Sequence, residues 1–334
     1  MMPTFCRRLL LALACALAGQ AAWAQSAGCR ERAADECYHS MSFAGGALHY
    51  YASLPAGAGP TRAIVAMHGH PRDANRTFDA TLLAARKDSA LDDTLIVAPV
   101  FQVPAGQSGK CHAPGTPPPQ DGDLLWTCAS WLEGGQADNG DRPGSFAALD
   151  ALVAELARRW PSLRGVTIAG FSAGAQMVQH YIGFARVQAA RPLALRYVVA
   201  DPGTWLYFDP LPGTDSCPAA NQWKYGTGNL PAALGRSAAE ARSQYAAADI
   251  HYLEGALDSA DAPGAFYRIL DKSCGAAAQG PFRLQRGQAY VEYERQVLTP
   301  GRSRPLTVVP GCAHDVSCVF PSDAARPALF GPTR

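Results

Sequence analysis

The sequence lacks the features that mark several other functional classes. It has no long run of one charge sign, no internal repeat and no basic stripe, and its 29 Lys and Arg residues nearly balance 28 Asp and Glu residues. We therefore expect no nucleic-acid partner and no disordered acidic segment. Because 48% of its 334 residues are hydrophobic, the chain can form a substantial core, as one large α/β domain or two small ones.

The patterns that hold structural metal ions are also missing. No C-x-x-C pair occurs and no His-rich cluster accompanies the cysteines, so we expect no metal site. His68 and His70 have the spacing of a possible metal-binding pair. They stand in a loop without a cluster of carboxylates, which favours packing and hydrogen-bonding roles for both.

A long apolar run occurs only at the N-terminus. Arg7 and Arg8 precede the run LLLALACALAG, and small residues at Ala22 and Ala24 follow it. This is the pattern of a secretory signal peptide over residues 1–24, and the run is too short to be a membrane span. We expect a soluble exported protein, periplasmic or secreted, without a membrane span. A lipid anchor on Cys29 is an alternative.

The cysteine count agrees with export. Cys6 and Cys15 leave with the signal peptide, and the eight that remain form an even number, which in an exported chain indicates disulfides. Sequence does not determine their connectivity, so we predict that sequence neighbours pair: Cys29 with Cys37, Cys111 with Cys128, Cys217 with Cys274, and Cys312 with Cys318.

Short apolar runs alternate with helical patterns along the chain. Strands are expected at 63–68, 94–101, 165–170, 195–200, 249–254 and 306–310, and helices at 74–87, at 145–160 with Ser145 as N-cap, and after residue 172. Continuous apolar strands separated by helices predict a mostly parallel sheet covered on both faces.

We expect one α/β domain over residues 25–334. Two segments interrupt the alternation of strands and helices. Residues 102–145 are rich in Pro and Gly and are expected to form a long loop held by Cys111 and Cys128. Residues 202–248 are expected to form a cap or rim over one end of the sheet.

The segment GFSAG places Ser172 between an expected strand and an expected helix. A G-x-S-x-G sequence in that position is typical of the nucleophile elbow of an α/β-hydrolase. Gly170 and Gly174 would permit a sharp turn that exposes the serine Oγ beside the amino end of the helix. A structural Gly-rich turn without catalytic chemistry is the alternative.

A nucleophilic serine needs a base, and in this fold the order along the chain is serine, acid, histidine. Three histidines follow Ser172: His180, His251 and His314. His180 is within the helix after the elbow and His251 is within an expected strand. His314 lies in a loop past the last strand, where the base belongs, and we therefore predict His314 as the base.

The acid should follow a strand between the serine and the histidine. Asp258 stands in a turn after the strand 249–254, where its carboxylate would accept a hydrogen bond from His314 Nδ1. Asp261 is a close rival, and Asp201, after the strand 195–200, is a third candidate.

Two backbone N–H groups should form an oxyanion hole. The residue after the nucleophile, Ala173, is expected to supply one, and His70 in the HGH turn is expected to supply the other. Trp205 and Tyr207 belong to an aromatic-rich segment that either lines a substrate pocket or is ordinary core; both interpretations stay open.

Three segments together resemble a known family. GFSAGAQM, VAMHGHPRDANRTF and VPGCAHD resemble the elbow, the oxyanion loop and the histidine loop of α/β-hydrolase serine hydrolases. GFSAGAQM is similar to the elbow of secreted esterases of the feruloyl esterase and polyhydroxybutyrate depolymerase type. The resemblance covers most of residues 40–320 and implies catalytic roles for Ser172, Asp258 and His314.

The expected reaction is the hydrolysis of a small or oligomeric carboxylic ester through an acyl-enzyme, which needs no cofactor. Because fold and triad do not specify the leaving group, a polyester depolymerase, a peptidase, a thioesterase and an acyltransferase are alternatives. An alternative of another class is a non-catalytic binding protein on a hydrolase scaffold. Neither acyl specificity nor oligomeric state follows from the sequence.

Overall fold

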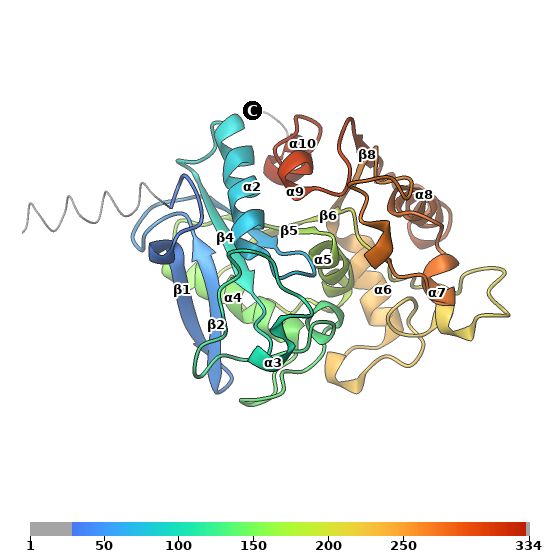
Figure 1. Ribbon diagram of the computed structural model, residues 1–334, viewed down its shortest axis with the longest axis horizontal. Coiled ribbons are helices and arrows are strands. Elements are labelled where there is room, and N and C mark those ends of the chain that lie inside the picture. Colours follow the sequence, from blue (N-terminus) through green and yellow to red (C-terminus); the bar gives the residue numbers. More distant parts are fainter. Residues whose placement is uncertain (1–28, 332–334) are drawn as a thin grey trace, which may run out of the picture.

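Eight strands form one mixed sheet in the computed structural model, which describes residues 29–331 (Figure 1). The strand order is β1-β2-β4-β3-β5-β6-β7-β8. The pairs β1–β2 and β2–β4 are antiparallel, whereas every neighbouring pair from β4–β3 to β7–β8 is parallel. The strands are β1 (Tyr38–Phe43), β2 (Gly46–Ala52), β3 (Arg62–Met67), β4 (Thr94–Val100), β5 (Gly165–Phe171), β6 (Ala194–Ala200), β7 (Asp249–Gly255) and β8 (Leu306–Val309).

Helices connect the parallel strands and cover both faces of the sheet (Figure 1). They are α2 (Ala74–Lys87), α3 (Ala105–Ser108), α4 (Ser145–Arg159), α5 (Ala173–Phe184), α6 (Ala238–Ala247), α7 (Cys274–Ala277), α8 (Arg283–Tyr293), α9 (Val316–Val319) and α10 (Arg326–Phe330). Short 3₁₀ turns lie at Asp35–Cys37, Ser130–Glu133, Pro218–Asn221, Ala232–Leu234 and Tyr267–Ile269, and a π-helical turn lies at Glu294–Leu298. Over residues 29–331, no helix is long and apolar enough to cross a membrane.

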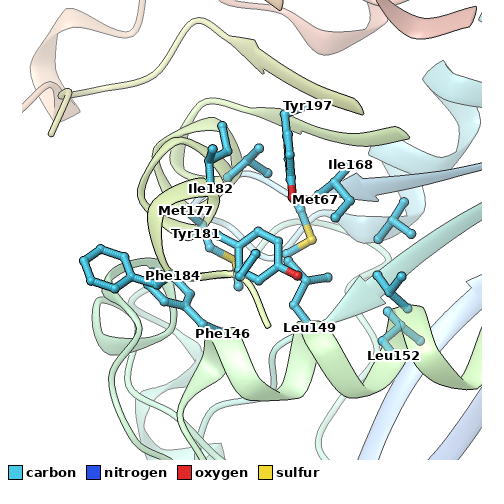
Figure 2. Packing of buried hydrophobic residues seen from close by; sticks show 14 of the residues in the cluster. Met67, Phe146, Leu149, Leu152, Ile168, Met177, Tyr181, Ile182, Phe184 and Tyr197 are labelled. Atoms are coloured by element: carbon cyan, nitrogen blue, oxygen red, sulfur yellow. The ribbon is translucent and has the colours of Figure 1, made fainter. Parts of the chain in front are cut away.

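The sheet has a separate apolar core on each face, because successive side chains of a strand point to opposite sides. In β3, Ala63, Val65 and Met67 pack in the cluster that includes α4 and α5, whereas Ile64 packs in the cluster with α2, α9 and α10. Figure 2 shows the first cluster, in which Tyr181 of α5 lies among residues of α4 and the central strands. The fully covered parallel sheet confirms the expected α/β fold class.

The hairpin of β1 and β2 was not predicted. Its strands add an antiparallel edge to the parallel sheet, with Phe43 opposite Gly46 across a two-residue turn. Both turn residues have positive φ, 48° at Ala44 and 75° at Gly45, as a tight hairpin turn of this kind requires. The Gly pair at 45–46 was the sequence signal for this turn.

One capping prediction was wrong. Ser145 is the first residue of α4, and Gly144 occupies the N-cap position. The Gly144 carbonyl accepts the first helical bond, from Ala148 N at 3.0 Å, whereas the Ser145 N–H donates outside the helix to Gly135 O at 3.0 Å. The buried hydroxyl of Ser145 has no hydrogen-bond partner among the described residues, so the side chain caps nothing.

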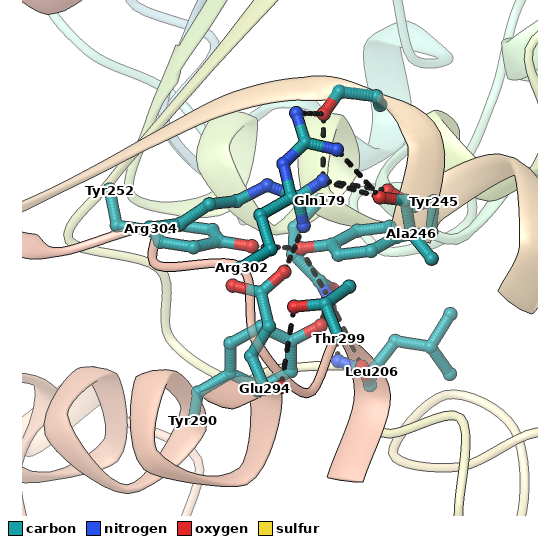
Figure 3. Close-up of polar contacts among 11 residues, drawn as sticks. Gln179, Leu206, Tyr245, Ala246, Tyr252, Tyr290, Glu294, Thr299, Arg302 and Arg304 are labelled. Atoms are coloured by element: carbon teal, nitrogen blue, oxygen red, sulfur yellow. Dashed lines mark hydrogen bonds and ion pairs between the residues drawn. The ribbon is translucent and has the colours of Figure 1, made fainter. Parts of the chain in front are cut away.

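A buried polar network joins α5, α6, β7 and α8 (Figure 3). The Gln179 amide donates to Tyr290 Oη and to Leu206 O, each at 3.1 Å. Arg304 pairs with Glu294 and donates to Ala246 O and Ala248 O at 2.7 Å each. The guanidinium thus satisfies carbonyls at the C-terminal end of α6, where a cation is favourable.

All four predicted disulfides are present: Cys29–Cys37, Cys111–Cys128, Cys217–Cys274 and Cys312–Cys318. Cys111–Cys128 holds the long segment between β4 and α4, as expected. Because Cys29 Sγ is bonded to Cys37, it is not free for a lipid. The predicted signal peptide at residues 1–24 lies outside the described residues.

Candidate active site

Four parallel strands bring the candidate residues to one edge of the sheet. Ser172 directly follows β5, Asp258 follows β7 and His314 follows β8, while the HGH turn follows β3. Since these strands run in the same direction, their carboxyl ends meet at the same edge. Residues up to 245 positions apart in the chain therefore become neighbours, from Gly69 to His314.

Ser172 occupies a sharp turn that only small neighbours permit. Its backbone has φ 58° and ψ −122°, a conformation that L-residues rarely adopt. A Cβ on Gly170 would lie 2.2 Å from Gly174 O, and a Cβ on Gly174 would lie 2.4 Å from Met67 O. The two glycines therefore allow β5, α5 and β3 to approach closely enough to form the turn.

Ser172, His314 and Asp258 form a continuous chain of hydrogen bonds. His314 Nε2 lies 2.8 Å from Ser172 Oγ, and His314 Nδ1 lies 2.7 Å from Asp258 Oδ2. Ser172 is partly exposed, whereas Asp258, at the other end of this chain of bonds, is 1% exposed. Phe171 packs against the imidazole, with ring centroids 4.8 Å apart. This is the geometry in which an imidazole can accept a hydroxyl proton while a carboxylate fixes its tautomer.

Arg283, which the sequence analysis missed, holds the acid in place. Its Nη1 donates to Asp258 Oδ1 at 3.1 Å and to Ala265 O at 2.7 Å. Burial alone would raise the pKa of Asp258, but the bonds from His314 and the charge of Arg283 together hold that pKa below its usual value. Arg283 begins α8, a helix without a motif in the sequence, so no pattern marked it.

The pKa of His314 is lowered, chiefly because the imidazole is buried; the hydrogen bond to Asp258 offsets part of this effect. A lowered pKa keeps the ring neutral near pH 7. A neutral imidazole with Nδ1–H facing Asp258 presents a free lone pair on Nε2 to Ser172.

The rival acids occupy different environments. Asp261 is exposed and forms no hydrogen bond with His314, whereas Asp201 is fully buried, with its Oδ1 accepting from Gly255 N at 2.8 Å. Burial and the nearby charge of Asp258 raise the pKa of Asp201 to about 8. Asp201 also adjoins Glu254, whose pKa is raised well above its usual value by burial and by Asp201. Of the three aspartates, Asp258 alone is hydrogen-bonded to His314.

The acid–histidine cluster has the composition of a small metal site, but the ligand atoms of two of its members are already hydrogen-bonded. One potential ligand atom from each of Asp201, Asp258 and His314 lies within 4.8 Å of the others. Both His314 nitrogens are already engaged by Ser172 and Asp258, and Asp258 is also bonded to Arg283. The direct hydrogen bonds account for the ligand atoms of His314 and Asp258, whereas Asp201 Oδ2 has no hydrogen-bond partner among the described residues.

The other candidate histidines lie elsewhere. His180 is completely buried in α5, where its two nitrogens face Gln176 O at 2.6 Å and Lys224 O at 2.8 Å. The helix position of His180 agrees with expectation. His251 lies in β7 beside Asp249, 3.2 Å away. Neither contacts Ser172.

The predicted oxyanion donors border the serine. Ala173 is the first residue of α5, so its N–H has no carbonyl partner within the helix. A Cβ built on Gly69 would lie 3.8 Å from Ser172 Cβ, which places the HGH turn beside the nucleophile. Gly69 N–H donates to Asp73 Oδ1 at 2.9 Å, a bond that holds the turn while the His70 N–H makes no bond to any described residue.

His68 has a packing role, as expected. It is fully buried, with Nδ1 2.8 Å from Gly69 O and Nε2 accepting from Phe101 N at 3.2 Å. Burial lowers its pKa to about 4, so the ring is neutral. Through these bonds His68 connects the HGH turn to the end of β4.

The suggested pocket at Trp205 and Tyr207 is not present. Trp205 is 0% exposed and stacks on Tyr290 at 4.4 Å between ring centroids, and Tyr207 is 2% exposed. Both side chains belong to the same hydrophobic core cluster as α4 and α5. The rest of residues 202–248 includes α6, the crossover helix that packs on α5.

Comparison with known proteins supports the fold. No protein-family model matches the chain, and no curated protein matches it. Poly(aspartic acid) hydrolase-1 from Sphingomonas sp. KT-1 is structurally similar, with a TM-score of 0.60, 20% identity, and coverage of 88% of this chain and 98% of that chain. LpqC, a poly(3-hydroxybutyrate) depolymerase from Bordetella parapertussis, matches with a TM-score of 0.60, 19% identity, and coverage of 89% and 91%.

Both matches extend over most of the two chains compared, so they concern the whole domain rather than one motif. The predicted resemblance is therefore confirmed at the level of architecture: this chain has the α/β-hydrolase fold.

Proposed function

We propose that the protein is an exported serine hydrolase that cleaves carboxylic esters through an acyl-enzyme. The observation that carries this proposal is the unbroken hydrogen-bond chain from Ser172 Oγ through His314 to Asp258. The strained serine turn and the N-terminus of α5 beside it supply the remaining elements of such a site. The four disulfides favour an oxidising compartment.

In the first half-reaction, Ser172 Oγ attacks the ester carbonyl while His314 Nε2 takes the hydroxyl proton. The N–H groups of Ala173 and His70 stabilise the oxyanion of the tetrahedral intermediate. When the intermediate collapses, the C–O bond to the alcohol breaks, and the alcohol leaves with the proton from His314. The acyl group remains on Ser172.

In the second half-reaction, water replaces the alcohol. His314 takes a proton from water, the hydroxide oxygen bonds to the acyl carbon, and the ester bond to Ser172 breaks as His314 returns the proton to Oγ. Asp258 stays ionised throughout and stabilises the imidazolium. Its lowered pKa, held down by His314 and Arg283 against the effect of burial, suits that role.

A second candidate is the hydrolysis of a polymer. Two structural relatives carry names that describe hydrolysis of poly(aspartic acid) and depolymerisation of poly(3-hydroxybutyrate), which motivates testing this chain on both. Clearing of a suspended polyester by the purified protein would support depolymerisation. Turnover of soluble monomeric esters without any clearing of the polyester would assign the activity to small substrates.

The test of the main proposal is fluorophosphonate labelling of the oxidised protein, with the modified residue identified by peptide mapping. We expect labelling confined to Ser172. Ser172→Ala should abolish labelling and ester turnover while leaving the melting temperature close to that of the parent protein, and Ser108→Ala is the matched control. A folded protein that is not labelled would reject the proposal in favour of a binding protein.

A further inference from the structure

The loop between β7 and α7 contains three exposed large apolar side chains, Leu257, Phe266 and Ile269. Phe266 is 54% exposed and Ile269 is 64% exposed, among the most exposed large apolar side chains of residues 29–331. Both line a groove of about 640 Å³ formed by the segment 261–269. Exposed apolar groups that gather at a concave surface are typical of a binding site.

Phe266 places this groove beside the reacting groups. Its ring centroid lies 6.1 Å from that of His314 in an edge-to-face arrangement. The same loop is joined to the histidine by a hydrogen bond of 3.1 Å from His314 N to Gly264 O. Phe171, the other aromatic neighbour of the imidazole, is 6% exposed, so the apolar surface that an incoming molecule meets beside His314 is Phe266.

The buried residue Ala265 attaches this loop to Arg283. Ala265 is 1% exposed, and its carbonyl accepts the Arg283 bond that also reaches Asp258. Phe266 itself has a positive φ of 47°, which reverses the chain direction immediately after the buried residue. The ring is therefore presented outward from a support shared with the acid of the site.

We propose that Phe266 and the adjoining groove bind the alcohol half of the ester and select substrates with an apolar alcohol. This inference rests on the proposed function, because there His314 Nε2 delivers its proton to the leaving oxygen. The carbon chain attached to that oxygen must then lie close to the imidazole, next to Phe266. The groove contains one acidic and one basic side chain, Asp261 and Arg268, so it has no net charge that would favour an ionised alcohol.

The experiment compares two ester series with the purified, oxidised protein. One series keeps the acetyl group and varies the alcohol from methyl to butyl, hexyl and benzyl; the other keeps the methyl alcohol and varies the acyl group from acetyl to hexanoyl. We expect kcat/KM of the parent protein to rise along the alcohol series. Phe266→Ala should lower kcat/KM for hexyl and benzyl acetate about ten-fold, as expected for losing part of an apolar contact.

The same substitution should change kcat/KM for methyl acetate and methyl hexanoate by less than about two-fold, since these esters leave the groove empty. Phe266→Leu should recover much of the loss. Val297→Ala, which truncates another exposed apolar residue (44% exposed), serves as the control and should resemble the parent on every ester.

Equal losses on both series would show that Phe266 acts on the position of His314 rather than on the alcohol, and would overturn the inference. An alcohol series without any trend in the active parent protein would do the same, while leaving the proposed ester hydrolysis intact. Absence of turnover on all esters, together with absent labelling of Ser172, would overturn the proposed function and this inference with it.

Discussion

Asp258 differs from the two rival aspartates in how its charge is compensated. Its two oxygens face His314 and Arg283, whereas the buried Asp201 has a single backbone donor and a carboxyl neighbour, Glu254. Opposite charges and donors favour ionisation, and a buried carboxyl beside other carboxyls favours the protonated form. Two carboxyl groups close to the same histidine thus acquire different protonation states from their surroundings.

This difference predicts the outcome of isosteric substitutions. Asp258→Asn should lower kcat by about a thousand-fold or more, because an amide no longer fixes the reactive imidazole tautomer or stabilises the imidazolium. Asp201→Asn should retain most of the activity, because a neutral amide replaces a neutral carboxyl and its oxygen can still accept from Gly255. Asp261→Asn is the exposed control.

Steady-state kinetics on one small ester, below the melting temperature of each variant, would check this prediction. Melting must be measured separately for Asp258→Asn, since that change leaves the buried Arg283 without its anionic partner. A larger kcat loss in Asp201→Asn than in Asp258→Asn would assign the acid to Asp201 instead.

At the scale of elements, the site depends on the close approach of β3, β5 and α5. The amino end of α5 lies against the carboxyl end of β3, so that Gly174 sits over the carbonyls of Met67 and His68. The carbonyl oxygens of Met67 and His68 cannot move without shifting β3 or the HGH turn that follows it. The same contact therefore sets the serine turn and places the predicted oxyanion donors.

Gly174→Ala should damage both stability and activity. The added Cβ would lie 2.4 Å and 2.5 Å from two backbone oxygens, and such overpacking against backbone should cost about 3 kcal/mol or more in the free energy of unfolding. Gly59→Ala, where an added Cβ meets nothing within 4 Å, should change that free energy by about 0.5 kcal/mol or less. Urea unfolding compares the two, and similar values would contradict the packing argument.

At the scale of the whole molecule, the four disulfides restrain different lengths of chain. Cys217 and Cys274 are 57 residues apart and connect the segment after β6 with α7, whereas Cys29 and Cys37 are 8 residues apart. A crosslink that closes a longer loop removes more conformational entropy from the unfolded chain. The Cys217–Cys274 bridge should therefore contribute the most to stability.

Replacing Cys217 and Cys274 together by serine should lower the free energy of unfolding by about 4 kcal/mol, against about 2.5 kcal/mol for Cys29 and Cys37 together, if loop entropy dominates. Denaturant unfolding of the oxidised double variants measures both values. A greater loss from removing the short Cys29–Cys37 loop would show that native contacts, rather than loop length, determine the contribution of each bridge.

The sequence by itself predicted the parallel strands from residue 62 onward and the helices α2, α4 and α5, because buried strands and amphipathic helices have distinct periods. It did not predict α6 or α8. The sequence also indicated Ser172, His314 and Asp258, since each follows a strand in the order that this fold requires. Pairing of cysteines with their sequence neighbours was confirmed at all four bridges. These inferences depend on local pattern and chain order, which sequence contains.

Only the tertiary structure decided the rest. The contact of His314 with Asp258 rather than with Asp261 or Asp201 depends on which segments pack together across the sheet. The support from Arg283 and the burial of Trp205 depend on the same packing. Such contacts join residues far apart in the chain and have no local signature. Burial and charge compensation arise from that packing, so the chemistry of each side chain at this sheet edge was settled by its neighbours in space.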